Sequence, residues 1–203
     1  MNLITISNVN LLLAMRYFTL LHSPYRKRHI PDFEYVLIEI INKDTVRAVA
    51  TDGHILGAMK IPCEVEQKME PGRIQIPAQH LEPKLWKNAP YLKIQWDSSS
   101  CFIISYDTKY TFNTVSNFIQ YEQIIPLTVT NQLAQFDFRY FKLILKIQRE
   151  LKKAKALDAS LGEVYIHYNG NKPSIIDIGA GNVFIMLMPF LYDKVEYTKP
   201  EWL

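Results

Sequence analysis

The sequence has few of the features that mark membrane proteins, secreted proteins or metal sites. Its 203 residues include only two cysteines, Cys63 and Cys101, which fit no metal-ligand spacing, cannot form a disulfide framework and favour a reducing compartment. No apolar run approaches the roughly 20 residues that cross a bilayer. The N-terminus has neither a basic start nor a small-residue cleavage site. We therefore expect a cytoplasmic protein with no membrane partner.

Signals of catalysis are also missing. There is no glycine-rich phosphate loop and no cluster with metal-ligand spacing, and no serine or cysteine is placed as a nucleophile for a pair formed by Asp52 and His54. The formal net charge is only +3, so any binding of nucleic acid depends on where the basic residues lie. The sequence predicts no catalytic residue, no cofactor and no metal site. An enzyme of unknown reaction remains a residual alternative.

The hydrophobic pattern, in contrast, is informative. With 48% hydrophobic residues, the chain can bury a core in one or two domains. The pattern strand, helix, three strands occurs three times. In the first unit a helix capped by Asn8 follows the first of four expected strands, at 3–7, 33–43, 45–53 and 54–62. In the second unit a short helix at 78–88, which Pro83 could interrupt, follows the first of the strands at 72–77, 91–99, 100–108 and 109–117. In the third unit a long helix at 139–157 follows the first of the strands at 132–138, 162–170, 172–181 and 182–190.

Such units predict an α+β fold with helices on one face of antiparallel sheets, because one unit cannot bury both its helix and its sheet alone. An ordinary α+β domain without a true repeat is the alternative. Between the strands at 45–53 and 54–62, Asp52 and Gly53 form a hairpin signal, since glycine accepts the positive φ of a tight turn.

Three segments resemble the bacterial DNA polymerase III β sliding clamp, the ring that tethers the replicative polymerase to DNA. "VATDGHILGAMKI" resembles the clamp's "VATDGHRLA", with Ile55 in place of its arginine. "SNFIQYEQIIP" resembles "GRFPDYERVIP", and "FIMLMPFLY" resembles the terminal "YVVMPMRL". The matches in the last two segments are Phe118, Tyr121, Glu122, Ile125, Pro126, Met188 and Pro189, with Leu191 displaced by one.

The resemblance implies a DNA-clamp-like fold with repeated strand-helix-three-strand units. It covers one complete clamp-like domain at 1–126 and a partial domain at 127–203 that ends in the C-terminal cleft strand. We expect a shortened relative, of the type that phages and prophages carry.

The resemblance also implies a cleft between the two domains that binds polymerase or clamp-loader peptides. One wall would contain Thr51, Gly53, His54 and Leu56, and the other Met188, Pro189, Phe190 and Leu191. Such a cleft needs an apolar floor for Leu and Phe anchors and a few polar groups that set the peptide's direction. The alternative is that His54 merely packs on its own strand and that residues 188–191 belong to an ordinary core strand.

Two sets of basic residues are candidates for sequence-independent contact with duplex DNA. Arg26, Lys27 and Arg28 follow the first helix, and Lys142, Lys146, Arg149 and Lys153 form one stripe of the long helix. An apolar stripe of the same spacing contains Tyr140, Ile144, Ile147 and Leu151. Basic side chains can hold phosphates without reading bases. The alternative is a solvated helix face.

The predicted function is therefore a sliding-clamp-like processivity factor for DNA replication. The alternative is a clamp-like module that captures or diverts clamp-binding replication proteins without encircling DNA. Clamp rings contain twelve helical units and this chain offers three, so a homo-oligomer is expected if a ring forms. The third unit would leave a sheet edge open unless another chain, as in a dimer, or the C-terminal segment at 195–203 covers it.

Overall fold

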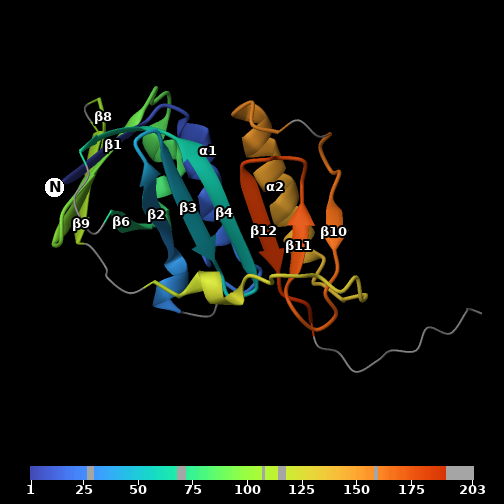
Figure 1. Cartoon of the computed structure of the whole chain (residues 1–203). Helices are drawn as coiled ribbons and strands as arrows, with labels where there is room; N and C mark the ends of the chain where they lie inside the picture. The colour runs from blue at the N-terminus through green and yellow to red at the C-terminus, as the bar shows by residue number, and fades with distance from the viewer. Residues whose placement is uncertain (27–29, 68–71, 107, 114–117, 158–159, 191–203) are drawn as a thin grey trace, which may run out of the picture.

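The structure is a computed structural model that describes residues 1–26, 30–67, 72–106, 108–113, 118–157 and 160–190. Within these ranges the chain forms two antiparallel sheets, two α-helices and several 3-10 helices (Figure 1). The predicted α+β class is confirmed.

The five-stranded sheet combines the first strand of the chain with the three later strands of the second unit. Its order is β5-β1-β7-β8-β9, with bounds Glu64–Gln67 for β5, Asn2–Ile6 for β1, Leu92–Trp96 for β7, Ser100–Ser105 for β8 and Thr108–Asn113 for β9. The sequence pattern does not predict β5, because three of its four residues are polar or charged. This strand pairs with β1, where the Thr5 hydroxyl donates to Glu66 at 2.7 Å.

The seven-stranded sheet combines strands from all three units. Its order is β10-β11-β12-β4-β3-β2-β6, with bounds Tyr165–His167 for β10, Ser174–Asp177 for β11, Val183–Leu187 for β12, Ile55–Pro62 for β4, Thr45–Thr51 for β3, Tyr35–Asn42 for β2 and Arg73–Pro77 for β6. Strands from both sides of residue 126 therefore share one sheet. The division into two domains at that residue stays a prediction.

The first two units exchange their leading strands. The strand β1 opens the first unit but pairs with β7 of the second, and β6 opens the second unit but pairs with β2 of the first. Each sheet therefore needs both units, which explains why one unit alone could not bury its apolar surface.

Each unit also contributes helices. The first unit has α1 (Val9–Ala14) continued by the 3-10 helix η1 (Met15–Phe18), the second has η3 (Ala78–Leu81) and η4 (Pro83–Trp86), and the third has α2 (Arg139–Lys153); two further 3-10 helices are η2 (Pro31–Glu34) and η5 (Tyr121–Ile124). The expected interruption by Pro83 is present, because Glu82 before it is extended (φ −69°, ψ 129°).

Asn8 occupies the N-cap position of α1, but its side chain makes no capping hydrogen bond. Its Nδ2 atom instead donates to the carbonyl oxygen of Ala154 at 3.1 Å, just beyond the end of α2. The sequence prediction was therefore right about where the helix begins and wrong about the bond.

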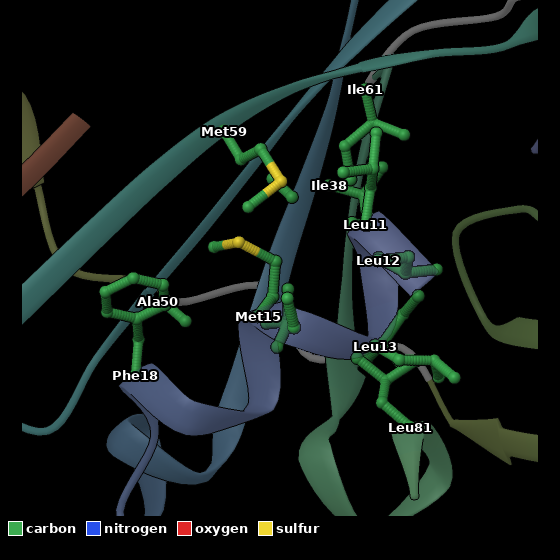
Figure 2. Packing of buried hydrophobic residues seen from close by; sticks show 14 of the residues in the cluster. Leu11, Leu12, Leu13, Met15, Phe18, Ile38, Ala50, Met59, Ile61 and Leu81 are labelled. Atoms are coloured by element: carbon green, nitrogen blue, oxygen red, sulfur yellow. The ribbon is translucent and has the colours of Figure 1, made fainter. Parts of the chain in front are cut away.

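The core lies between the helices and the seven-stranded sheet, and it includes residues of both sheets. Met15 of η1 points toward Met59 of β4, with Phe18 nearby (Figure 2). A Cβ on Gly57 of β4 would come within 2.4 Å of the Phe18 ring, so this close packing requires glycine. Helix α2 lies beside α1 on the same side of the sheet (Figure 1).

The third unit differs from the other two in its leading strand. The predicted strand at 132–138 does not form, and that prediction was wrong. In the first two units the leading strand joins the sheet of a partner unit. The described part of the chain contains no fourth unit whose sheet the leading strand of the third unit could join. This segment instead runs beside the residues that follow β10 and β12. The amide of Asn131 donates to the carbonyl oxygen of Tyr168 at 2.9 Å, and the amide of Gly170 donates to that of Gln132 at 2.8 Å. The amide of Phe190 donates to the carbonyl oxygen of Gln135 at 2.8 Å.

Candidate peptide-binding cleft and basic helix face

The turn between β3 and β4 is held by the Asp52 side chain, which is 3% exposed. Its Oδ1 atom accepts hydrogen bonds from the backbone N–H groups of His54 and Ile55, both at 2.8 Å. Gly53 has a φ of +88°, in the left-handed region that favours glycine. A Cβ at this position would also lie 2.7 Å from the Phe33 ring. The predicted Asp-Gly hairpin is confirmed.

The second carboxylate oxygen of Asp52 connects this turn to two other elements. It accepts hydrogen bonds from the Ser23 hydroxyl at 2.5 Å and from the Tyr140 hydroxyl of α2 at 2.7 Å. Burial, together with the Asp52 carboxylate, raises the pKa of Tyr140. Asp52 contacts the backbone of His54 in these bonds, so its position is explained by the architecture of the turn without a catalytic pair.

The β3–β4 turn and the C-terminal strand meet where β4 pairs with β12 (Figure 1). Leu56 lies opposite Met186 in this pairing, and the amide of Met188 donates to the carbonyl oxygen of His54 at 2.7 Å. The rings of His54 and Phe190 stack with centroids 6.1 Å apart, and Tyr25 lies 4.8 Å from His54 on centroids. The fold thus brings together two segments that are about 130 residues apart in the sequence.

A largely apolar groove of about 440 Å³ opens at this junction. Five of the predicted cleft residues line it: Thr51, Gly53, His54, Leu56 and Met188. Pro189 and Phe190 follow directly after Met188 but are not among the lining residues. The eighth, Leu191, lies outside the described residues.

Six further residues line the groove and were not predicted as site residues: Phe33, Ile55, Ile119, Ile124, Pro173 and Met186. Two signals could have found some of them. Met186 is two residues before Met188, and alternate residues of a strand share a face. Ile119 and Ile124 belong to the segment at 116–126 that resembles the clamp. Phe33 reaches the groove from η2 and Pro173 from the loop before β11, and no pattern in the sequence pointed to either as a site residue.

The segment around η5 packs on the sheet face that carries Leu56 and Met186. Tyr121 anchors it, because its hydroxyl donates to Glu39 of β2 at 2.8 Å and the Arg47 guanidinium lies 5.4 Å from its ring centroid. Tyr121 and Ile125 also line a second groove of about 400 Å³, together with residues of β4 and β12.

The two stripes of α2 are separated as predicted. Tyr140, Ile144, Ile147 and Leu151 are each at most 1% exposed, whereas Lys142, Lys146, Arg149 and Lys153 are exposed. Lys146, Arg149 and Lys153 line a groove of about 510 Å³ with Lys152 and Tyr17. Lys152 and Tyr17 were not predicted. Lys153 also pairs with Glu150 at 3.1 Å.

The loop after the first helical segment is only partly described. Arg26 is exposed and lines a different groove, of about 330 Å³, with Glu34 and residues of η3. Lys27 and Arg28 lie outside the described residues. The structure therefore brings together three of the four basic residues predicted on α2, but does not place Arg26 in the same groove.

In the described ranges, no group of three or more His, Cys, Asp or Glu side chains is arranged to hold a metal ion. No helix there combines the length and apolar character that crossing a bilayer would need. Burial raises the pKa of Cys63 to about 11 and that of Cys101 to about 12, so neither is a reactive thiolate near neutral pH.

No protein-family model and no curated protein sequence matches this chain. Solved structures do match it. The β subunit of DNA polymerase III from Thermotoga maritima aligns over 95% of this chain with a TM-score of 0.67 and 12% sequence identity. The Caulobacter crescentus β sliding clamp aligns over 94% of this chain with a TM-score of 0.65 and 14% identity. The DnaN sliding clamp from Bartonella birtlesii bound to griselimycin aligns over 94% of this chain with a TM-score of 0.64 and 15% identity. This chain spans 66% of the length of each of these clamps. The chain therefore has the fold of the DNA polymerase III β sliding clamps.

Proposed function

We propose that the protein is a sliding-clamp-like processivity factor, which binds polymerase or loader peptides in the groove at the β4–β12 junction and contacts duplex DNA through α2. The observation that carries this proposal is the groove itself. All three segments whose sequences resemble the clamp contribute residues to its walls, and the fold in which they meet is that of the clamps.

The groove suits short peptides with leucine and phenylalanine anchors. Leu56, Met186 and Ile119 provide apolar surface, while Thr51 and His54 carry polar groups. Methionine is unbranched and polarisable, and it adapts to side chains of different shape. The volume of about 440 Å³ is within the range of ligand pockets, which is roughly 300–1,000 Å³.

The basic face of α2 suits the phosphate backbone. Lys146 and Arg149 are exposed and lie in one groove, and Lys142 is exposed one turn before Lys146. Charges of this kind neutralise phosphates without selecting a base sequence. A protein that moves along DNA needs contacts of this kind.

The experiment that tests the peptide site is a binding titration with a fluorescent peptide that carries the clamp-binding segment of a bacterial replicative polymerase. The double variant His54→Ala/Met188→Ala should bind this peptide at least tenfold more weakly while keeping its unfolding midpoint. Phe184→Ala is the matched control, because Phe184 is on β12, the strand that leads to Met188, but lines the second groove. Unchanged affinity in the folded double variant would remove the peptide site.

The DNA contact is tested by measuring the affinity for a duplex at several salt concentrations. Each phosphate contact contributes about 0.9 to the slope of log affinity against log salt, so Lys146→Ala/Arg149→Ala should reduce the slope by about 2. The control, Lys43→Ala/Lys60→Ala, removes the same charge from two exposed positions away from α2, one in the turn between β2 and β3 and one on β4. An equal reduction in both variants would mean that net charge, and not the helix face, determines binding.

One observation favours the alternative, a peptide-binding module that does not encircle DNA. Both walls of the groove come from a single chain, so peptide binding requires no ring. The two functions differ in retention on DNA. A processivity ring should stay on circular DNA and leave it after linearisation, whereas the module should bind its peptide equally well and show no such difference.

A further inference from the structure

The β4–β12 junction shows how units of this fold join edge to edge. The strand β4 is the third of the three successive strands of the first unit, and β12 is the third of those of the third unit. The two strands pair antiparallel, from Val183 opposite Met59 to Leu187 opposite Ile55. The two third strands thus join the three strands β10-β11-β12 to the four strands β4-β3-β2-β6 in one sheet.

The second unit has a third strand in the same position. The order β1-β7-β8-β9 repeats the order β6-β2-β3-β4, in which an exchanged leading strand is followed by the first, second and third strands. By this correspondence β9 is the equivalent of β4. Within the described part of the chain, β9 pairs with β8 alone, so its outer edge has no counterpart of β12.

The composition of β9 favours pairing. Its sequence, TKYTFN, is rich in threonine and aromatic residues, which suit strands. Tyr110 and Phe112 are half-buried on the side of η3 and η4, where His80 stacks on Phe112 with centroids 5.2 Å apart and Trp86 meets Tyr110 edge-on at 5.3 Å. The alternate residues, Lys109, Thr111 and Asn113, are exposed.

The free edge of the other sheet, at β10, is a weaker candidate for pairing with a second chain. The edge strand β10 has only three residues, and very short edge strands are one way in which proteins avoid edge-to-edge pairing. The segment at 131–135 also runs beside the loop after β10, where Asn131 and Gly170 take part in backbone hydrogen bonds. The open edge expected in the third unit therefore offers less for pairing than β9, which has six residues.

We propose that β9 pairs antiparallel with β9 of a second copy of this chain, with Thr111 opposite Thr111. This register places Tyr110 of each copy opposite Phe112 of the other, and Lys109 opposite Asn113. Aromatic pairs and threonine pairs across strands stabilise antiparallel sheets. The contact is self-complementary, which a two-fold dimer requires.

The dimer would have ten strands in one continuous sheet, five from each copy. The groove at the β4–β12 junction belongs to the other sheet, so pairing through β9 leaves a groove in each copy. The inference does not rest on the proposed function, because it concerns the assembly of the chain and not what the groove binds.

The test introduces a charge at Thr111, the residue that lies opposite its own copy in the proposed dimer. Thr111→Glu and Thr111→Lys each place like charges directly opposite one another, which destabilises the pairing. The full chain should sediment at twice 23.7 kDa at tens of micromolar, each variant alone should sediment as a monomer, and a mixture of the two should regain the dimer. The mixture also shows that the variants fold, since only folded chains restore the pairing.

The matched control is His167→Glu, an exposed position on β10, which should leave the dimer intact. A monomeric unaltered chain at these concentrations would overturn the proposal. So would a dimer that survives in both Thr111 variants, or one that is lost in His167→Glu. Loss of peptide affinity in the groove variants, by contrast, would have no bearing on this dimer.

Discussion

The Tyr140 hydroxyl donates a 2.7 Å hydrogen bond to Oδ2 of Asp52, and this bond joins α2 to the turn between β3 and β4. The Asp52 carboxylate also holds the backbone of that turn and the Ser23 hydroxyl. A single buried side chain therefore fixes one wall of the groove relative to the helix that carries the basic face.

Tyr140→Phe should lower the free energy of unfolding by about 2 kcal/mol, because it removes a hydrogen bond to a buried carboxylate. Urea denaturation measures this loss. Tyr165→Phe is the control, since Tyr165 is 64% exposed and its change should stay within about 0.5 kcal/mol. Because Ser23 and Tyr140 share one acceptor atom, Ser23→Ala combined with Tyr140→Phe should not be additive. A neutral Tyr140→Phe would show that Asp52 does not depend on this donor.

Gly53→Ala should destabilise the protein more than Gly162→Ala. Both glycines have positive φ, +88° and +92°, so both substitutions strain the backbone by about 1 kcal/mol. A Cβ at residue 53 would in addition meet the Phe33 ring at 2.7 Å, whereas nothing lies within 4 Å of one at residue 162. The difference between the two unfolding midpoints reports the Phe33 contact. Equal losses would mean that the ring moves aside at no cost.

Ile55→Arg, which introduces the arginine of the clamp segment, should lower the free energy of unfolding by more than about 3 kcal/mol. Ile55 is 1% exposed and belongs to the main core, so a charged side chain there would be buried without a partner. Ile55→Val, the control, should cost only about 1 kcal/mol. A stable Ile55→Arg variant would indicate that the side chain escapes into the groove.

His80→Asn should weaken the dependence of stability on pH between about 7.5 and 5. Burial lowers the pKa of His80 below its ordinary value, so the unfolded chain takes up a proton at this residue more readily than the folded protein. The stabilisation from neutral His80 is therefore complete above the unfolded pKa and is lost as the pH falls through the folded one. Thermal unfolding at a series of pH values measures the slope. Parallel curves for the two proteins would exclude this contribution.

Much of the fold could be read from local pattern. The alternation of β7 and β8 and the buried stripe of α2 each depend on which side of one element meets the core, and the Asp52–Gly53 turn depends on two adjacent residues. The five groove residues found in advance came from the resemblance to the clamp. Three of the other six, Phe33, Ile119 and Pro173, approach the groove from separate parts of the chain, and periodicity within one element contains no information about its neighbours.

The sequence by itself determined most of the helices and strands, because periods of 2 and 3.6 residues record which face of a strand or helix is buried. It also determined the conformation of the Asp52–Gly53 turn, which depends on two adjacent residues. Only the tertiary structure decided that β12 lies beside β4, that residues 132–138 form no strand and that Asn8 binds Ala154. These features depend on which backbone edges find a partner, and a strand edge is satisfied by segments far away in the sequence.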